Sequence, residues 1–324
     1  MVPSNLQSFL RRTTPSVPSR FLSKSSIHYR TPEWQFHGGK DPIEYFTLGD
    51  LWDCYDEWSA YGVGTPLRLE DHHQPVVQYY TPFLSGIQLY SGKVSGPRSP
   101  NSKEDSEFET DSTCSDGGVV KLSRSSSDCS NRTWDSEDSG SDQEVDSKIR
   151  ERLGRLYFQY FETSGPHLRP PLRDMINKLS ETYPGLHSLR SIDLSPASWM
   201  AIAWYPIYHI PAQRNPKELY SAFLTYHTLS STFQGGAEEL SMEKVKRSGC
   251  GDVDGELVSI KDEPRTLSLP PFGLAAYKMQ TQIWINPRTE DFQQLTSLWS
   301  AAASWLRQLE AHHPDFDFFN IRTM

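Results

Sequence analysis

The stretch "SWMAIAWYPIYHIP", residues 198–211, decides the fold. From residue 199 to 205 both alternating sets of positions are apolar or aromatic, which is typical of a strand covered on both faces. The small side chains of Ala201 and Ala203 allow a helix to pack closely, and the tryptophan-rich C-terminal helix is the expected cover. Pro206 cannot continue central pairing, so we expect "YPIYHIP" to run to a sheet edge or loop.

Two segments before and after this strand have the apolar spacing of helices. "DLWDCYDEWSAYG" (50–62) predicts a helix with Asp50 as N-cap and Gly62 as its end. "TEDFQQLTSLWSAAASWLRQLEAHHP" (289–314) predicts a long helix that begins at Thr289 and is ended by Pro314. The first helix presents an apolar stripe of Leu51, Tyr55, Trp58 and Tyr61, and the second one of Leu295, Trp299, Ala302, Leu306 and Leu309.

Two further helices are expected between these segments. "KIRERLGRLYFQYF" (148–161) repeats apolar residues at helical intervals and is followed by "SGP". "PPLRDMINKLSETYPG" (170–185) has prolines at its start, where a missing amide proton costs little, and Pro184 with Gly185 at its end. Both segments predict helices on the same grounds of spacing and termination.

The remaining apolar segments predict strands. "VVQYYTPFLSGIQLY" (76–90) is β-branched and aromatic and reads as two short strands or a hairpin, broken between Pro82 and Gly86. Residues 220–229 and 272–285 are the other strand candidates. Strands follow one another without strict alternation with helices, and no glycine fingerprint of a dinucleotide fold is present. We therefore expect an α+β fold with a mainly antiparallel sheet covered by helices.

Long polar segments interrupt this fold. Of the 324 residues only 36% are hydrophobic, and residues 101–147 carry thirteen acidic against four basic residues, which accounts for the whole net charge of −9. Such serine-rich, acidic sequence cannot bury enough apolar area to offset its chain entropy. We expect disordered insertions at 92–147 and 233–266 within a single domain over 33–322, and a flexible basic N-terminal arm over 1–32.

Composition also limits the cellular setting and the partners. Cys54, Cys114, Cys129 and Cys250 form no CxxC pair, which suits a reducing compartment, so we expect a cytoplasmic or nuclear protein. The basic N-terminus resembles an organellar transit peptide, but prolines interrupt it after one short helix, which disfavours targeting. No apolar run is long enough to cross a bilayer. The near-neutral body lacks the basic patch that nucleic acid requires, and protein partners are the expectation.

The acidic insert carries a pattern of acid-directed phosphorylation. Several hydroxyl residues have an acid three positions downstream, and one follows Arg124 by three. Phosphate would add about 1.5 to 2 negative charges per site. The candidates are Ser102, Ser106, Thr113, Ser125, Ser127, Ser139 and Ser141.

Seven stretches together resemble a known family: "NLQSFLRRTTPSVPS", "LGDLWDCYDEWSAYGVGTPL", "VVQYYTPFLSGIQLY", "SWMAIAWYPIYHIP", "FLTYHTLSSTFQ", "FGLAAYKM" and "HHPDFDFF". They occur in order from residue 5 to about 320 and are similar to the plant family called domain of unknown function 789. The resemblance implies a plant protein, and it favours "FLRRTTPSVPS" as part of the family pattern over a transit peptide. It implies no activity.

The sequence gives only weak evidence for catalytic or metal-binding sites. His72 and His73 after Asp71, and His312 and His313 before Asp315 and Asp317, have ligand residue types, but adjacent residues point apart, so we expect no metal site. An imidazole of the second pair, at a helix C-terminus, would be partly protonated. Asp50, Asp53, Asp56 and Glu57 form a solvated helix face rather than a catalytic carboxylate pair. "YGVGTP" lacks the lysine and third glycine of a phosphate loop.

Two functions stay open at this stage. The first is a non-enzymatic interaction or regulatory protein without cofactor, whose acidic loop docks to or releases a basic partner according to its phosphorylation. The second is an enzyme or small-ligand binder. Its pocket would lie at the outer end of the central strand and on the next one, lined by Tyr205, Tyr208, His209, Tyr226 and His227. No GxSxG or cysteine signature supports nucleophilic catalysis.

Overall fold

The computed structural model describes the chain in six segments, all of which belong to one compact unit made of Met1–Lys93 and Leu153–Met324. The expected insert 92–147 and most of the loop 233–266 lie outside these segments. The described residues are 3–23, 43–69, 76–91, 153–212, 219–231 and 265–320.

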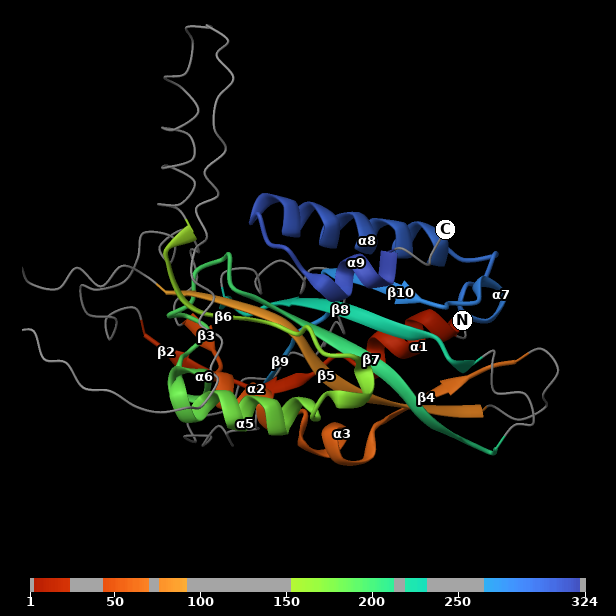
Figure 1. Ribbon diagram of the computed structural model, residues 1–324, viewed down its shortest axis with the longest axis horizontal. Helices are drawn as coiled ribbons and strands as arrows, with labels where there is room; N and C mark the ends of the chain where they lie inside the picture. Colours follow the sequence, from red (N-terminus) through yellow and green to blue (C-terminus); the bar gives the residue numbers. More distant parts are fainter. Residues whose placement is uncertain are drawn as a thin grey trace, which may run out of the picture. The chain divides into compact units, whose positions relative to one another are not determined.

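The main sheet is built around the strand on which the sequence analysis began. β7 (Trp199–Ile210) lies between β5 (Val76–Ser91) and β8 (Ala222–Thr228) (Figure 1). The order is β10 (Gly273–Tyr277), β8, β7, β5 and β4 (Val63–Leu67), and β6 (Arg155–Phe161) also pairs with β5. The pairings are antiparallel. The expected α+β class with a mainly antiparallel sheet is confirmed.

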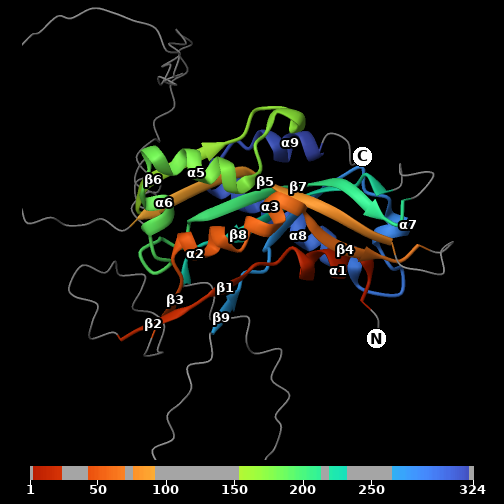
Figure 2. The same ribbon diagram turned by 90° about the horizontal axis from the view of Figure 1, so that it is seen from below.

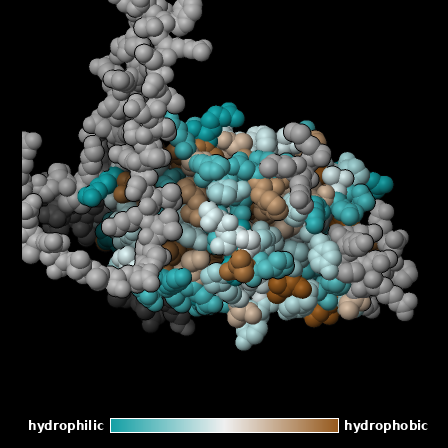
Figure 3. Space-filling view, in the orientation of Figure 1, coloured by the Kyte–Doolittle hydropathy of each residue, from teal (hydrophilic) through white to brown (hydrophobic). Residues whose placement is uncertain are grey.

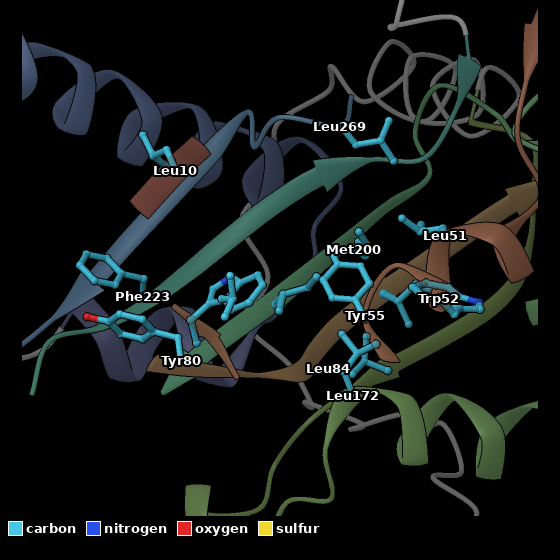
Figure 4. Close-up of a cluster of buried hydrophobic side chains, with 14 of the residues drawn as sticks. Leu10, Leu51, Trp52, Tyr55, Tyr80, Leu84, Leu172, Met200, Phe223 and Leu269 are labelled. Atoms are coloured by element: carbon cyan, nitrogen blue, oxygen red, sulfur yellow. The ribbon is translucent and has the colours of Figure 1, made fainter. Parts of the chain in front are cut away.

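Helices cover both faces of this sheet. Residues Trp199–Trp204 are all buried, and they alternate between two apolar clusters. The face that carries Ala201 packs against α8 (Asp291–Gln308) and α9 (Pro314–Asn320). The opposite face packs against α1 (Asn5–Arg12), α2 (Leu48–Asp53), α3 (Asp56–Tyr61) and α5 (Leu172–Thr182), as Figures 1 and 4 show. The first half of the opening stretch is therefore a doubly covered strand, as expected.

α8 lies close against β10, a different strand from the one on which a close approach was expected. A Cβ at Gly273 of β10 would stand 2.8 Å from the Cβ of Ala302, so these two small residues let the helix lie against the strand. The last expected strand, 272–285, is shorter in the structure. It ends at Tyr277, Lys278 has a positive φ of 53°, and the short helix α7 (Thr281–Trp284) follows.

The N-terminal segment is part of the core rather than a flexible arm. Leu6, Phe9 and Leu10 of α1 are buried. The side chain of Asn5 bonds the backbone of Arg68 in both directions, at 2.9 and 2.8 Å. β1 (Ser16–Pro18) then pairs with β9 (Thr266–Ser268), and β2 (Arg20–Leu22) pairs with β3 (Ile43–Tyr45) (Figure 2). The expectation for 1–32 is wrong over residues 3–23, because an amphipathic helix with basic residues in its last turn resembles a basic arm in composition.

The helix expected over 148–161 is wrong over residues 155–161, whereas Leu153 is helical. Residues 155–161 form β6, and Leu89 of β5 pairs with Phe158. "RLYFQYF" is aromatic, and aromatic residues favour strands when a neighbouring edge is free to pair. The apolar spacing was compatible with both structures. Gly154, which has a φ of 85°, lies immediately before the strand.

The segment 76–90 forms one continuous strand instead of two. β4 pairs with residues 76–80 of β5 and β6 with residues 86–91, so 81–85 face a gap on that edge among the described strands. Pro82, which lacks a donor, lies in this gap and disturbs no ladder there. The opposite edge pairs with β7 from Val77 to Gln88, with irregularities at Tyr79/Tyr80 and at Leu84/Gly86. At the second irregularity, Leu84 and Gly86 pair with successive residues of β7, so Ser85 has no partner residue on that strand.

The helix expected over 50–62 is divided in two. α2 begins after Thr47, whose side chain accepts from the Asp50 amide, so Asp50 is the third residue of a capping box and not the N-cap. α3 follows and ends at Gly62, which has a φ of 78°. Tyr61, expected in the apolar stripe, is exposed.

The other expected helices are present. α5 fills the segment that begins with prolines, and the short helices η3 (Pro166–Leu168) and α6 (Gly185–Ser188) lie on either side of it. α8 has Glu290 rather than Thr289 as its N-cap. Pro314 does not end α8, which stops at Gln308 before Glu310 with its positive φ of 50°. Pro314 opens α9 instead, where a proline fits the first turn.

Candidate functional site

The strand irregularity at Ser85 places its hydroxyl inside a buried polar cluster beneath α9. Ser85 lies on β5, Tyr226 on β8, and His313 and Asp315 at the start of α9; Arg169 follows η3. We call these five residues the Ser85 network. All of them are buried.

Charge pairing holds the network together. Arg169 binds Asp315 through two nitrogens, at 2.6 and 2.8 Å, and donates to the Ser164 carbonyl at 2.7 and 2.9 Å. The Ser85 hydroxyl donates to Asp315 at 2.5 Å. Glu162, nearby, accepts from Tyr160 and from two backbone amides. Although burial acts to raise it, these hydrogen bonds hold the pKa of Glu162 below its ordinary value.

The hydrogen bonds of the network also determine the tautomer of His313. Because the Ser85 proton is directed to Asp315, the 2.9 Å contact between Ser85 Oγ and His313 Nε2 requires the imidazole to donate. Nδ1 then accepts from the Tyr226 hydroxyl at 2.7 Å. Burial lowers the pKa of His313 to about 4. For His313, the partly protonated imidazole expected from the sequence is wrong, since this ring is inside the protein rather than at an open helix end.

This geometry does not suit a nucleophile and its base. In a catalytic serine–histidine pair the hydroxyl donates to the imidazole, which in turn is oriented by the carboxylate. Here serine donates to the carboxylate and histidine donates to serine, and every member is buried. The network therefore joins α9 to the sheet, and it is a structural centre.

The second buried histidine has a similar structural explanation. His227 Nδ1 lies 2.8 Å from the Leu269 carbonyl, so it carries the proton, and Nε2 accepts from Thr225 at 2.9 Å. Trp204 donates to the same threonine oxygen at 2.9 Å. Burial lowers the pKa of His227 to about 4. Every polar atom of this imidazole is satisfied inside the protein.

The five residues expected to line a pocket are not brought together. Tyr205 and Tyr226 belong to the cluster under α8 and α9, whereas His227 faces the other side of β8. Tyr208 and His209 lie beyond the end of β8, where only β5 pairs with β7. The second half of the opening stretch thus reaches a sheet edge, as expected. Burial, followed by the charge of Asp315, raises the pKa of Tyr205 to about 12.

The other candidates of the sequence are placed as follows. Asp53 and Asp56 both bind Arg173, at 2.9 Å, and Asp50 binds Arg20, so these carboxylates are neutralised by arginine. His312 is exposed, beside Asp317. In the described ranges no group of three or more His, Cys, Asp or Glu side chains is placed to hold a metal, and no helix could span a membrane. Asp71, His72, His73 and the seven phosphorylation candidates lie outside those ranges.

An open groove runs along β4. Its volume is about 390 Å³. Two glycines of "YGVGTP" contribute backbone to it, and Trp58 of α3 and Tyr79 of β5 contribute aromatic rings. We call it the β4 groove; it is lined by Arg12, Glu57, Trp58, Gly62, Val63, Gly64, Pro66, Val77 and Tyr79.

Large apolar side chains surround this groove at the outer end of β7. Tyr61, Ile207, Tyr208 and Ile210 are 70%, 47%, 44% and 55% exposed, and we call them the β7-end patch. They adjoin the groove, because Tyr208 stacks on Tyr79 at 4.4 Å and Ile210 pairs across the strands with Val77. Figure 3 shows that brown apolar residues reach the surface in the lower part of the molecule, among paler and teal ones.

Fold and surface together define the class of the protein: an α+β protein with an antiparallel sheet covered on both faces, a buried structural polar network and an open aromatic groove. Residues 4–319 match the family described as protein of unknown function DUF789, and the chain belongs to this family. No curated protein and no solved structure shows significant similarity to it. The resemblance found in the sequence is confirmed.

Proposed function

We propose that this protein is a non-enzymatic interaction protein, and that the β7-end patch with the β4 groove is its docking surface. The observation that supports this is the exposure of four large apolar residues on one sheet end, next to a groove. Exposed apolar patches of this kind mark interaction sites. The buried Ser85 network, with its hydrogen bonds already made, offers no support for the enzymatic alternative.

The patch can be tested by replacing one apolar residue with a charge. Ile210→Asp alters an exposed side chain, so the fold should persist, and Phe292→Asp on α8 is a matched control at a residue that is 64% exposed. Tagged proteins are expressed in plant tissue, in line with the plant origin that we propose, and the bound proteins are compared. We expect Ile210→Asp to lose partners that Phe292→Asp keeps. Equal sets of bound proteins would argue against the patch.

We further propose that the acidic insert regulates this interaction in the cytoplasm or nucleus. The support is its composition, with thirteen acidic residues over 101–147 and seven candidate phosphorylation sites. Deleting residues 92–147 should change which proteins bind, or how tightly. Phosphoproteomics that finds no modified residue between 95 and 147 would contradict the phosphorylation step while leaving the patch untouched.

A further inference from the structure

We propose that the β4 groove binds an extended, proline-rich peptide that carries one basic residue. This inference rests on the proposed function, because it names the partner of the same surface. Three features of the groove support it: its aromatic walls, its unused hydrogen-bond donors and its charge.

Two aromatic residues and two glycines contribute to the lining of the groove. They are Trp58 and Tyr79, and Gly62 and Gly64, and neither glycine could carry a side chain without crowding. A Cβ at Gly64 would stand 3.2 Å from the ring of Tyr79, and one at Gly62 would stand 2.9 Å from Ile207. The side chains of Ile207, Val77 and Tyr79 therefore pack directly onto these two glycines, which brings the Tyr79 ring close to the β4 backbone. Polyproline helices dock in grooves lined in this way.

The aromatic wall is held in place before any ligand binds. The rings of Tyr79 and Tyr208 stack with an interplanar angle of 20°, and the Tyr208 hydroxyl donates to the Tyr61 carbonyl at 3.1 Å. On the other wall, Trp58 packs on Tyr55 and Trp204. Rings that are already fixed lose little conformational freedom on binding, which favours a rigid partner such as polyproline.

Hydrogen bonding favours a polyproline peptide over an added β-strand. A polyproline helix makes no internal hydrogen bonds, so its carbonyls need donors. Trp58 and Arg12 both line the groove, and within the described ranges neither the Trp58 indole nitrogen nor the Arg12 guanidinium makes a hydrogen bond. β4 is an edge strand, but Pro66 lacks the amide proton that strand addition would use along it.

The negative charge of Glu57 in the groove favours a peptide that carries one basic residue. Glu57 lines the groove, is exposed, and forms no ion pair within the described part of the chain. The neighbouring acids Asp53 and Asp56 are bound to Arg173, so Glu57 is the carboxylate left for a ligand on this side of α3. A lysine or arginine of the peptide would pair with it, while Arg12 donates to peptide carbonyls.

The experiment uses the full chain and a fluorescein-labelled decapeptide of prolines with one central arginine. Binding is followed by fluorescence polarisation and by the indole N–H resonance of Trp58 in TROSY spectra, assigned with Trp58→Phe. Two variants remove one feature each: Trp58→Phe keeps a ring on Tyr55 but loses the donor, and Glu57→Gln loses the charge. Phe292→Ala is the control on α8.

We expect the peptide to shift the Trp58 indole resonance and to bind about tenfold more weakly to Trp58→Phe. Glu57→Gln should weaken binding severalfold and remove the preference for arginine over glutamate at the central position, and Phe292→Ala should change nothing. Absence of an indole shift, equal affinity of the variants, or tighter binding of a valine–threonine peptide of the same length would overturn the inference. If the peptide fails while Ile210→Asp still loses partners, the proposed interaction function stands and only the ligand class is wrong.

Discussion

The Ser85 network predicts that Asp315→Asn destabilises the protein strongly. The substitution preserves shape but leaves the charge of Arg169 without its partner, at a pair whose side chains are only 4% and 6% exposed. Breaking a buried pair from one side costs about 3 to 5 kcal/mol. At about 2 to 4 °C per kcal/mol for a domain of this size, the melting temperature should fall by about 6 to 20 °C.

Urea unfolding followed by tryptophan fluorescence measures this free energy directly. Asp193→Asn is the matched control, because its pair with Arg190 is 36% to 41% exposed and should contribute less than about 1 kcal/mol. Replacing both buried partners, with Arg169→Met and Asp315→Leu, should recover much of the stability, since no uncompensated charge is left. If Asp315→Asn costs no more than Asp193→Asn, the network does not hold α9 as described.

Three further predictions concern stability. The pKa values of His227 and His313 are lowered to about 4, so below pH 6.5 the unfolded chain binds more protons than the folded protein does. The free energy of unfolding should therefore fall from pH 6.5 towards pH 4, by up to about 1.4 kcal/mol per pH unit for each histidine. Urea midpoints at pH 7 and 5 measure this, and His227→Gln should reduce the difference. Asn5→Ala leaves backbone groups at the end of β4 unpaired and should cost about 1 to 3 kcal/mol by thermal unfolding, whereas an unchanged melting temperature would mean that water replaces the amide. Gly273→Ala crowds α8 and should cost about 1 to 3 kcal/mol by the same assay, and a stabilised variant would show that the helix can move away.

Patterns with one physical interpretation were predicted correctly. The doubly apolar run at 199–204 has no stable place except a strand covered on both faces, and Pro206 ends its pairing with β8. The helix at 172–182 has prolines before it and Pro184 after it. In both cases the signal is local, so neighbouring elements did not need to be known.

Patterns that suit two structures were not decided by the sequence. The residues of β6 have apolar spacing compatible with a helix, and they form a strand because the edge of β5 beyond residue 85 is free to pair. The break expected at Pro82 does not occur, because the gap between β4 and β6 lies there. Each outcome depends on which strand is the neighbour.

The residues of the candidate sites were likewise only partly predictable from the sequence. His313 and Asp315 were noticed for their residue types, but Ser85 and Arg169 carry no sequence signal beyond a polar residue in an apolar strand and an arginine before prolines. The groove residues Trp58 and Tyr79 were recognised only as a helix stripe and a strand. Their meeting beside two glycines depends on how α3 and β5 pack.

By itself, the sequence determined the α+β class, the central strand and the family, because composition and periodicity act within a few residues of each other. The tertiary structure decided what the polar residues do. It buried the histidines among partners more than 40 residues away in sequence, such as Leu269 and Ser85, and it left the second half of "SWMAIAWYPIYHIP" exposed beside a groove. Burial and exposure depend on contacts between distant segments, and such contacts exist only after folding.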